Sequence, residues 1–257
     1  MKVVILAGGL GTRISEESHL RPKPMIEIGG KPIIWHIMKT FYAQGFDDFI
    51  ICGGYKCSMI KEYFLNYKIL NSDVRFNMLE DKVEIINDHS EEWKVTVVDT
   101  GPNTLTGGRL KRIANYLDDN EDFFFTYGDG VSDISLNSLL ERHKNENCLA
   151  TVTAVIPPGR FGYIEVLENK VSQFAEKQDN NRSYVNGGFF VLNKKCLDYI
   201  DGDKTSWESS PLERLAIEGQ LAVYKHGGFW QAMDTMRDKK ILEDLWQDGL
   251  PPWKNWS

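Results

Sequence analysis

Residues 3–13 of the chain read VVILAGGLGTR, an apolar run that stops at a glycine-rich turn. A continuous apolar run is typical of a parallel strand that is covered on both faces of its sheet. Glycine has no Cβ, so backbone N–H groups in the turn can approach a phosphate chain and form a nest of donors around it. The stretch therefore predicts a central strand followed by a loop that can cradle phosphates.

Two cations flank this loop, since Arg13 ends it and Lys23 follows before a proline. A departing pyrophosphate requires positive charge that does not itself react. The loop matches neither the dinucleotide pattern GxGxxG nor the phosphate pattern GxxxxGK, because Gly11 is followed by Thr12 and Arg13. A simple tight turn and two solvated surface cations are an alternative explanation of the same residues.

The rest of the chain alternates between strand and helix patterns. Apolar periodicity predicts helices near residues 33–41, 59–70, 108–117 and 136–144, and strands near 48–52, 74–78, 95–98, 121–127 and 149–156. Beyond residue 156 we expect short strands near 163–167, 171–174 and 184–192, and then helices near 207–218 and 236–247. The alternation predicts an α/β fold with a mostly parallel central sheet flanked by helices, and a small β-rich part after it.

Composition limits the classes of function that remain. A chain of 257 residues with 42% hydrophobic residues can bury one sizeable core, so we expect a single domain, residues 1–257. The formal charge of −7 gives no general attraction to nucleic acid or to an anionic membrane. No apolar segment approaches the ~20 residues that span a bilayer, and the scattered cysteines suggest reduced thiols. We expect a soluble, cytoplasmic protein.

Two aspartates have the surroundings of metal ligands. Asp129 follows an apolar strand and stands between glycines, in the crevice where open α/β sheets bind ligands. A single carboxylate rarely holds Mg²⁺ unaided, and Asp234, just before a predicted helix, offers a second. A turn or cap role also explains Asp129, and an N-cap role explains Asp234.

Residues 99–109, DTGPNTLTGGR, form a third polar segment. Its hydroxyls, amide and glycine N–H groups stand ahead of a helix and could bind the polar edge of a base, while Arg109 adds charge. A hydrogen-bonded base pocket is selective because a wrong base leaves buried groups unpaired. A plain capped turn explains these residues as well.

Taken together, LAGGxGTR at residues 6–13, KP at 23–24, GGKPI at 29–33 and YGDG at 127–130 resemble the sugar-1-phosphate nucleotidylyltransferase family over essentially the whole chain. More specific stretches are similar to the branch of that family that uses CTP and glucose 1-phosphate. These stretches are WHIM at 35–38, TGGRLKR at 106–112, PPGRFG at 157–162, VNGGFFV at 185–191 and PWK at 252–254.

The resemblance implies a Rossmann-like nucleotidyltransferase fold, with residues 1–156 mainly a nucleotide-binding core and residues 157–257 mainly the sugar-phosphate side and C-terminal helices. It implies that Mg²⁺ is held by Asp129 and Asp234, and that Arg13, Lys23 and Asp129 are catalytic. The implied nucleotide-binding residues are Leu6, Ala7, Gly8, Gly9, Leu10, Gly11, Thr12, Arg13, Lys23, Thr104, Gly108, Arg109 and Gly128. The implied sugar-phosphate residues are Lys177, Asn186 and Gly187, with Glu165 as a further candidate.

The implied reaction is in-line attack of a sugar-phosphate oxygen on the α-phosphorus of CTP, with pyrophosphate leaving. The attacking oxygen is already ionised near neutral pH, so no general base is assigned. One departure concerns the sugar, because the chain has Gln178 after Lys177 where the family usually has proline.

Two other functions stay open. One is a uridylyl- or thymidylyltransferase of the same fold, and the other is a non-catalytic sugar-nucleotide-binding regulatory subunit. Retention of both cations and both carboxylates argues against the second. Residues 249–257 contain two prolines and two tryptophans. We expect this tail to pack either on its own body or on a neighbouring subunit, and hence expect a homo-oligomer.

Overall fold

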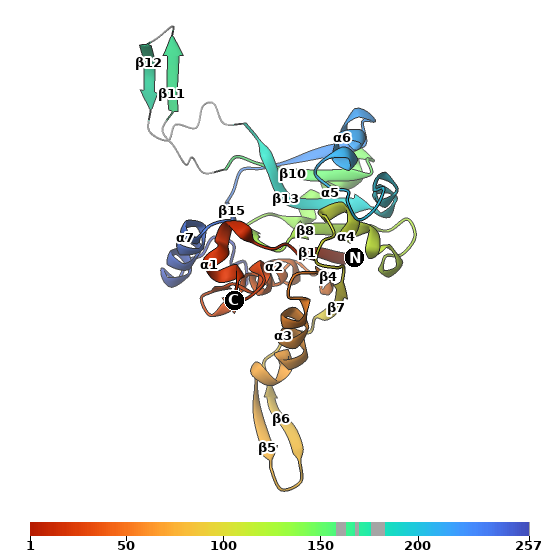
Figure 1. Cartoon of the computed structure of the whole chain (residues 1–257), viewed down its shortest axis with the longest axis vertical. Helices are drawn as coiled ribbons and strands as arrows, with labels where there is room; N and C mark the ends of the chain where they lie inside the picture. Colours follow the sequence, from red (N-terminus) through yellow and green to blue (C-terminus); the bar gives the residue numbers. More distant parts are fainter. Residues whose placement is uncertain (158–162, 168–169, 176–182, 257) are drawn as a thin grey trace.

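The computed structural model describes residues 1–157, 163–167, 170–175 and 183–256 (Figure 1). At its centre lies a seven-stranded sheet in the order β14-β10-β13-β8-β1-β4-β7. These strands are β1 (Lys2–Ala7), β4 (Asp48–Gly53), β7 (Lys94–Asp99), β8 (Asp122–Tyr127), β10 (Ala150–Val155), β13 (Val185–Asn193) and β14 (Leu221–His226). β13 runs antiparallel to β8 and β10, and the other neighbours are parallel, which confirms the predicted mostly parallel sheet.

Helices cover both faces of this sheet (Figure 1). The helices and 3-10 turns, in chain order, are η1 (Thr12–Ile14), α1 (Ser15–Ser18), η2 (Lys23–Met25), α2 (Ile33–Tyr42), α3 (Cys57–Leu70), α4 (Thr106–Arg112), η3 (Ala114–Tyr116), α5 (Leu136–Glu146), η4 (Lys194–Tyr199), α6 (Ser210–Ile217) and α7 (Met236–Gln247). The helix expected at 108–117 is shorter than predicted and continues as η3. None of the helices in the described part of the chain combines the length and apolar character that crossing a bilayer requires.

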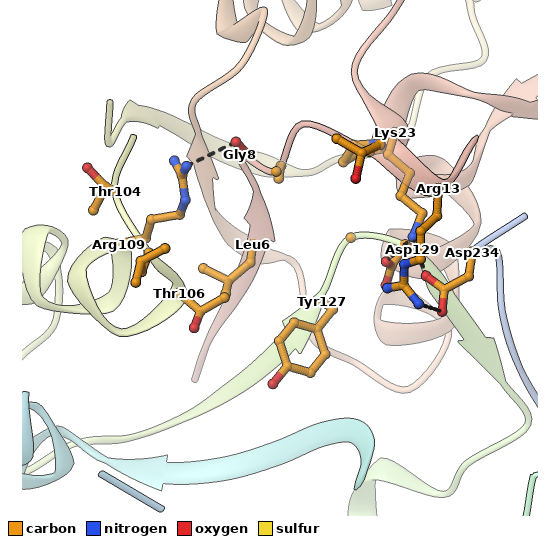
Figure 2. Close-up of a pocket in the computed structure, with 17 residues that line it drawn as sticks. Leu6, Gly8, Arg13, Lys23, Thr104, Thr106, Arg109, Tyr127, Asp129 and Asp234 are labelled. Atoms are coloured by element: carbon orange, nitrogen blue, oxygen red, sulfur yellow. Dashed lines mark hydrogen bonds and ion pairs between the residues drawn. The ribbon is translucent and has the colours of Figure 1, made fainter. Parts of the chain in front are cut away.

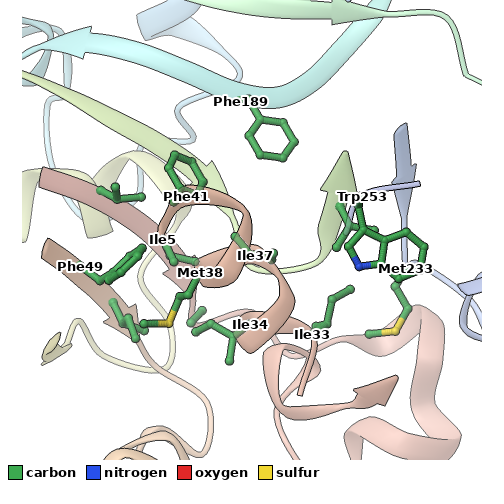
Figure 3. Packing of buried hydrophobic residues seen from close by; sticks show 14 of the residues in the cluster. Ile5, Ile33, Ile34, Ile37, Met38, Phe41, Phe49, Phe189, Met233 and Trp253 are labelled. Carbon is green, nitrogen blue, oxygen red and sulfur yellow. The ribbon is translucent and has the colours of Figure 1, made fainter. Parts of the chain in front are cut away.

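β1 shows why the chain has two cores. Val3 and Ile5 belong to the same core as Phe41 of α2 and Trp253. Figure 3 shows Ile5, Phe41 and Trp253 in this core. Val4 and Leu6 point to the opposite side, with Leu110 of α4. Side chains alternate along a strand, so a run that is apolar at every position fits a strand buried on both faces. This confirms the central strand predicted from residues 3–7.

β13 lies elsewhere than the sequence pattern suggested. The sequence pattern predicts that the strand near 184–192 is one of several short strands that follow the main sheet. In the structure this strand lies inside the main sheet, between β8 and β10. Residues 187–192 are all buried, so they require cover on both faces, which only a central position provides. β14, which the sequence pattern did not predict, also joins the sheet at the edge beside β10.

Among the residues that the structure describes, four further strand pairs lie outside the central sheet. They are β2 (Glu27–Ile28) with β3 (Lys31–Pro32), β5 (Ser72–Asn77) with β6 (Lys82–Asp88), β9 (Gly130–Ser132) with β15 (Trp230–Ala232), and β11 (Tyr163–Leu167) with β12 (Lys170–Ala175). The strand expected at 74–78 thus belongs to a hairpin, which projects away from the body beyond α3 (Figure 1). Most of its side chains are exposed, and it therefore contributes nothing to the central core.

The C-terminal tail packs on its own body. The Trp253 side chain is 1% exposed, and its ring stacks on those of Phe229 and Trp246. Of the two positions left open for the tail, the structure therefore has the intramolecular one, so the tail no longer supports an oligomer. All four cysteines are free thiols, as expected.

Candidate active site

The glycine-rich loop lines a cavity of about 330 Å³ at the carboxyl end of β1 (Figure 2). Every residue predicted for this loop lines the cavity except Leu10, whose side chain is 54% exposed. The turn after β8 packs against the end of β1 at the wall of this cavity, because the Gly128 N–H donates to the Leu6 carbonyl at 2.8 Å. A Cβ at residue 128 would lie 2.6 Å from that oxygen, so only glycine permits this approach.

At one end of the cavity Lys23 stands between two carboxylates (Figure 2). Its Nζ donates to Asp129 Oδ2 at 2.6 Å and to Asp234 Oδ1 at 2.7 Å. Arg13 donates to Asp234 Oδ2 at 2.9 Å. The structure therefore brings together the two predicted cations and the two predicted metal ligands.

Lys23 remains charged in this position. Burial alone lowers the pKa of its ammonium group, but the two carboxylates outweigh that effect, so the pKa is raised above its ordinary value. The Lys23 side chain is 12% exposed. A buried ammonium group of this kind supplies fixed positive charge to whatever occupies the cavity.

The two aspartates meet because the strands next to them pair. β9 and β15 run antiparallel, and the Met233 N–H donates to the Asp129 carbonyl at 2.8 Å. Asp234 is not the N-cap of α7, since Thr235 takes that role and forms a capping box with Asp238. The alternative explanation of Asp234 as a cap is therefore wrong, and its carboxylate reaches the cavity.

The donor set suits a divalent cation. Mg²⁺ is usually bound by one or two carboxylates together with phosphate oxygens and water. Asp129 and Asp234 converge on one cation, the Lys23 ammonium group, which is the arrangement that a shared metal requires. Within the described residues no cluster of three or more His, Cys, Asp or Glu side chains could hold a metal alone.

Arg109 lies at the other end of the cavity with Thr104 (Figure 2). Its guanidinium group donates to the carbonyls of Gly8 at 3.0 Å, Gly53 at 3.1 Å and Gly101 at 2.8 Å. Burial lowers the pKa of Arg109, but a guanidinium group stays protonated in proteins. Arg109 thus holds three loops together at the cavity wall, a role that the sequence did not reveal.

Gly108 lies beside the cavity rather than in its wall. A Cβ at residue 108 would lie 2.6 Å from the Cα of Asp203, so this glycine allows α4 to pack against the segment that leads to α6.

A second cavity of about 270 Å³ adjoins the first and shares Arg13, Tyr127, Asp129 and Asp234 with it. The predicted sugar-phosphate residues Asn186 and Gly187 line it. Trp230 lines it too, and its Nε1–H donates to the Gly187 carbonyl at 2.7 Å.

Two other predicted sugar-phosphate residues cannot be placed at this cavity. Lys177 lies outside the described residues. Glu165 is on β11, of which the structure describes the backbone.

Neither Tyr127 nor Thr106 is among the nucleotide-binding residues that the resemblance implies, although both line the first cavity. Tyr127 was within reach of prediction, since it precedes Gly128 in the YGDG stretch at the end of a strand. Thr106 belongs to the polar segment 99–109, whose hydroxyls could bind a base, but its place at the start of a helix is also the signature of a cap.

The comparisons with known proteins agree with this geometry. A family model described as nucleotidyl transferase matches residues 2–246, and the chain belongs to that family. The site is therefore that of a nucleotidyltransferase, an enzyme class that generally uses a divalent metal.

Proteins of similar sequence show which nucleotidyltransferases the chain resembles. Glucose-1-phosphate cytidylyltransferases of Salmonella typhimurium and Salmonella typhi are both 54% identical to the chain over 257 residues, which is 100% of each protein. A mannose-1-phosphate guanyltransferase of Yarrowia lipolytica is 30% identical over 94% of this chain and 62% of its own length.

Solved structures share the fold. HddC from Yersinia pseudotuberculosis superposes with a TM-score of 0.71 at 23% identity, over 95% of this chain and 99% of that protein.

Proposed function

We propose that the chain transfers a cytidylyl group from CTP to α-D-glucose 1-phosphate, giving CDP-glucose and pyrophosphate. The observation that carries this proposal is Lys23 held between Asp129 and Asp234, where the glycine-loop cavity meets the second cavity. The full-length 54% identity to glucose-1-phosphate cytidylyltransferases supports the choice of both substrates.

The two cavities suit the two substrates. The loop of residues 6–13 cradles the triphosphate through its backbone N–H groups, while Thr104, Arg109, Gly108 and Gly128 shape the pocket for the rest of the nucleotide. Asn186 and Gly187 receive the sugar phosphate in the second cavity. Lys177 and Glu165 are the further residues that we propose for sugar-phosphate binding. Because Arg13, Asp129 and Asp234 line both cavities, the phosphates of the two substrates meet beside them.

The chemistry that follows is an in-line displacement. A phosphate oxygen of glucose 1-phosphate attacks the α-phosphorus of CTP, and the bond to the bridging oxygen of pyrophosphate breaks. Arg13 and Lys23 neutralise the charge that develops on the leaving group. No residue has to remove a proton, since the attacking oxygen is ionised, and so catalysis depends on positioning and charge.

Asp129 and Asp234 would hold Mg²⁺, which when bound screens the negative phosphates and aligns their oxygens. Lys23 would then turn from the carboxylates toward the phosphates.

The remaining parts of the proposal concern the whole protein. We propose that it acts in the cytoplasm as a homo-oligomer, without nucleic acid or membrane partners. Residues 1–156 and 157–257 would divide the nucleotide and sugar-phosphate roles within one domain.

The test is pyrophosphate release with Mg²⁺, glucose 1-phosphate and, in separate reactions, CTP, UTP, dTTP and ATP. We expect release with CTP. Release with UTP or dTTP instead would replace the base assignment, and nucleotide binding without release would favour a regulatory subunit.

A further inference from the structure

Glu208 is an exposed residue that follows Trp207 and lies outside the walls of both cavities, yet its carboxylate accepts hydrogen bonds from residues that form those walls. Tyr127 Oη–H donates to Oε1 at 2.6 Å, and Thr106 Oγ1–H donates to Oε2 at 2.6 Å. Ser206 Oγ–H also donates to Oε2, at 2.6 Å. Hydrogen bonds to a charged acceptor are about twice as strong as neutral ones.

The backbone that carries Glu208 is fixed to the start of α4. The Leu105 N–H donates to the Asp203 carbonyl at 2.8 Å, and the Gly108 N–H donates to the Thr205 carbonyl at 3.2 Å. The Trp207 N–H donates to Thr106 Oγ1 at 2.9 Å, and the Trp207 side chain is fully buried. Glu208 is therefore anchored, although its side chain is exposed.

Thr106 and Tyr127 connect this carboxylate to the two cavities. Thr106 lines the cavity of the glycine loop, and Tyr127 lines both cavities. The Tyr127 hydroxyl also accepts from Asn186 Nδ2 at 3.4 Å, and Asn186 lines the second cavity. A chain of hydrogen bonds thus runs from Thr106 through Glu208 and Tyr127 to Asn186.

The direction of these bonds follows from the donors and acceptors that the groups offer. The Tyr127 phenol donates its single O–H to Glu208, and its lone pairs accept from Asn186.

We propose that Glu208 is a positioning residue that sets the nucleotide pocket and the sugar-phosphate pocket in register through Thr106 and Tyr127. This inference rests on the proposed function. In-line attack requires the two substrates to be aligned closely, and small misplacements are costly in rate. Glu208 acts on the cavities through Thr106 and Tyr127, so its loss should impair both the use of glucose 1-phosphate and turnover.

The experiment compares Glu208→Ala and Glu208→Gln with the wild type by pyrophosphate release, with kcat and the KM of each substrate measured separately. Glu213→Ala, at an exposed glutamate of α6, is the matched control. We expect Glu208→Ala to raise the KM for glucose 1-phosphate and to lower kcat/KM about tenfold, the loss of one charged hydrogen bond. Glutamine has the same size and keeps one acceptor, so Glu208→Gln should recover part of this loss.

A double-mutant cycle with Tyr127→Phe isolates the coupling. Because Tyr127 and Glu208 act as one unit, adding Tyr127→Phe to Glu208→Ala should cost far less than Tyr127→Phe costs alone. A residue that served stability only would lower the melting temperature or the active fraction and would leave both KM values unchanged.

The outcomes separate the two proposals. If the wild type releases no pyrophosphate from CTP and glucose 1-phosphate, the proposed function fails and this inference fails with it. If the wild type is active and Glu208→Ala matches Glu213→Ala in both KM values and kcat, or the cycle is additive, Glu208 has no positioning role. Should Glu208→Ala fail to fold, Glu208→Gln and the cycle of Glu208→Gln with Tyr127→Phe decide the question by the same criteria.

Discussion

Asp129 and Asp234 show how far single residues could be predicted. The sequence marked Asp129 because a carboxylate after an apolar strand falls at the ligand-binding edge of a parallel sheet. For Asp234 the sequence predicted either a metal ligand or a helix cap, because local sequence cannot show whether Asp234 or its neighbour Thr235 caps α7. The structure resolves that choice, because Thr235 has the capping geometry.

Asp129→Asn should lower turnover by roughly 10²-fold or more, which is typical when one preorganised electrostatic group is lost. The amide has no charge to hold Mg²⁺ and pairs more weakly with Lys23. Steady-state pyrophosphate release at saturating Mg²⁺ measures the loss, with the exposed Asp198→Asn as the control. Near-normal turnover of the Asp129 variant would remove this carboxylate from the mechanism.

Arg109 shows what the sequence could not reveal at this scale. Its charge predicted a place near the phosphates, but its guanidinium group donates to the carbonyls of Gly8, Gly53 and Gly101, which lie at the ends of three strands. Such contacts depend on the positions of β1, β4 and β7 in the sheet, which single residues do not encode.

Gly8→Ala tests the role of Arg109 without changing its charge. A Cβ at residue 8 would lie 2.0 Å from a guanidinium nitrogen of Arg109, so this side chain must leave its carbonyl acceptors. We expect the KM for CTP to rise about tenfold, as for the loss of a charged hydrogen bond. Gly227→Ala is the control, since a Cβ there meets nothing within 4 Å. An unchanged KM for CTP would show that the position of Arg109 is immaterial to nucleotide binding.

At the scale of elements, α7 begins and ends at the residues that the sequence predicted, 236 and 247, because the helix has an amphipathic pattern and a clear N-terminal signal. The C-terminal tail was harder to place, since its tryptophans suit an internal core and a subunit interface equally. In the structure Trp246, Trp253 and Trp256 surround His36 of α2, and the Trp253 Nε1–H donates to His36 Nδ1 at 3.4 Å.

His36 makes this packing sensitive to acid. Burial lowers the pKa of His36 from 6.5 to about 4. Between these values the unfolded chain binds a proton that the folded chain does not, so the free energy of unfolding rises with pH. The stabilisation is complete above pH 6.5 and is lost as the pH falls toward 4.

Because of His36, the free energy of unfolding should therefore fall by about 2 kcal/mol when the pH is lowered from 7 to 5, at ~1.4 kcal/mol per unit of pKa shift. Urea unfolding at the two pH values measures the change. His36→Gln cannot take up a proton, so its stability should fall less over the same interval. Equal falls in the variant and the wild type would mean that other groups cause the acid sensitivity.

For the whole molecule, the fold class followed from sequence because apolar runs such as that of β1 alternate with helical patterns along the first half of the chain. The strand order did not follow, since β13 and β14 enter the sheet from the second half of the chain. Periodicity shows that a strand is buried, but it does not show which neighbours bury it.

The hairpin of β5 and β6 carries the surface that we assign to contact with a second copy of the chain. Cross-strand pairs put Val74 opposite Ile85 and Phe76 opposite Val83, so one face of the hairpin is apolar. Phe76 is 57% exposed and Val83 is 55% exposed. An isolated two-stranded hairpin is marginally stable in water, and its apolar face requires cover. A second copy of the chain is the cover that our proposal of a homo-oligomer supplies.

Light scattering tests this assignment. The wild type should have a mass that is a multiple of 29.5 kDa, and Phe76→Glu combined with Val83→Lys should shift it toward the mass of one chain. The new pair of opposite charges can still stabilise the hairpin itself, because the two positions face each other. Lys82→Glu, whose position is opposite Asn77 on the other face, should leave the mass unchanged. A wild-type mass of 29.5 kDa would rule out the homo-oligomer, and an unchanged mass in the double variant would place the subunit contact elsewhere on the surface.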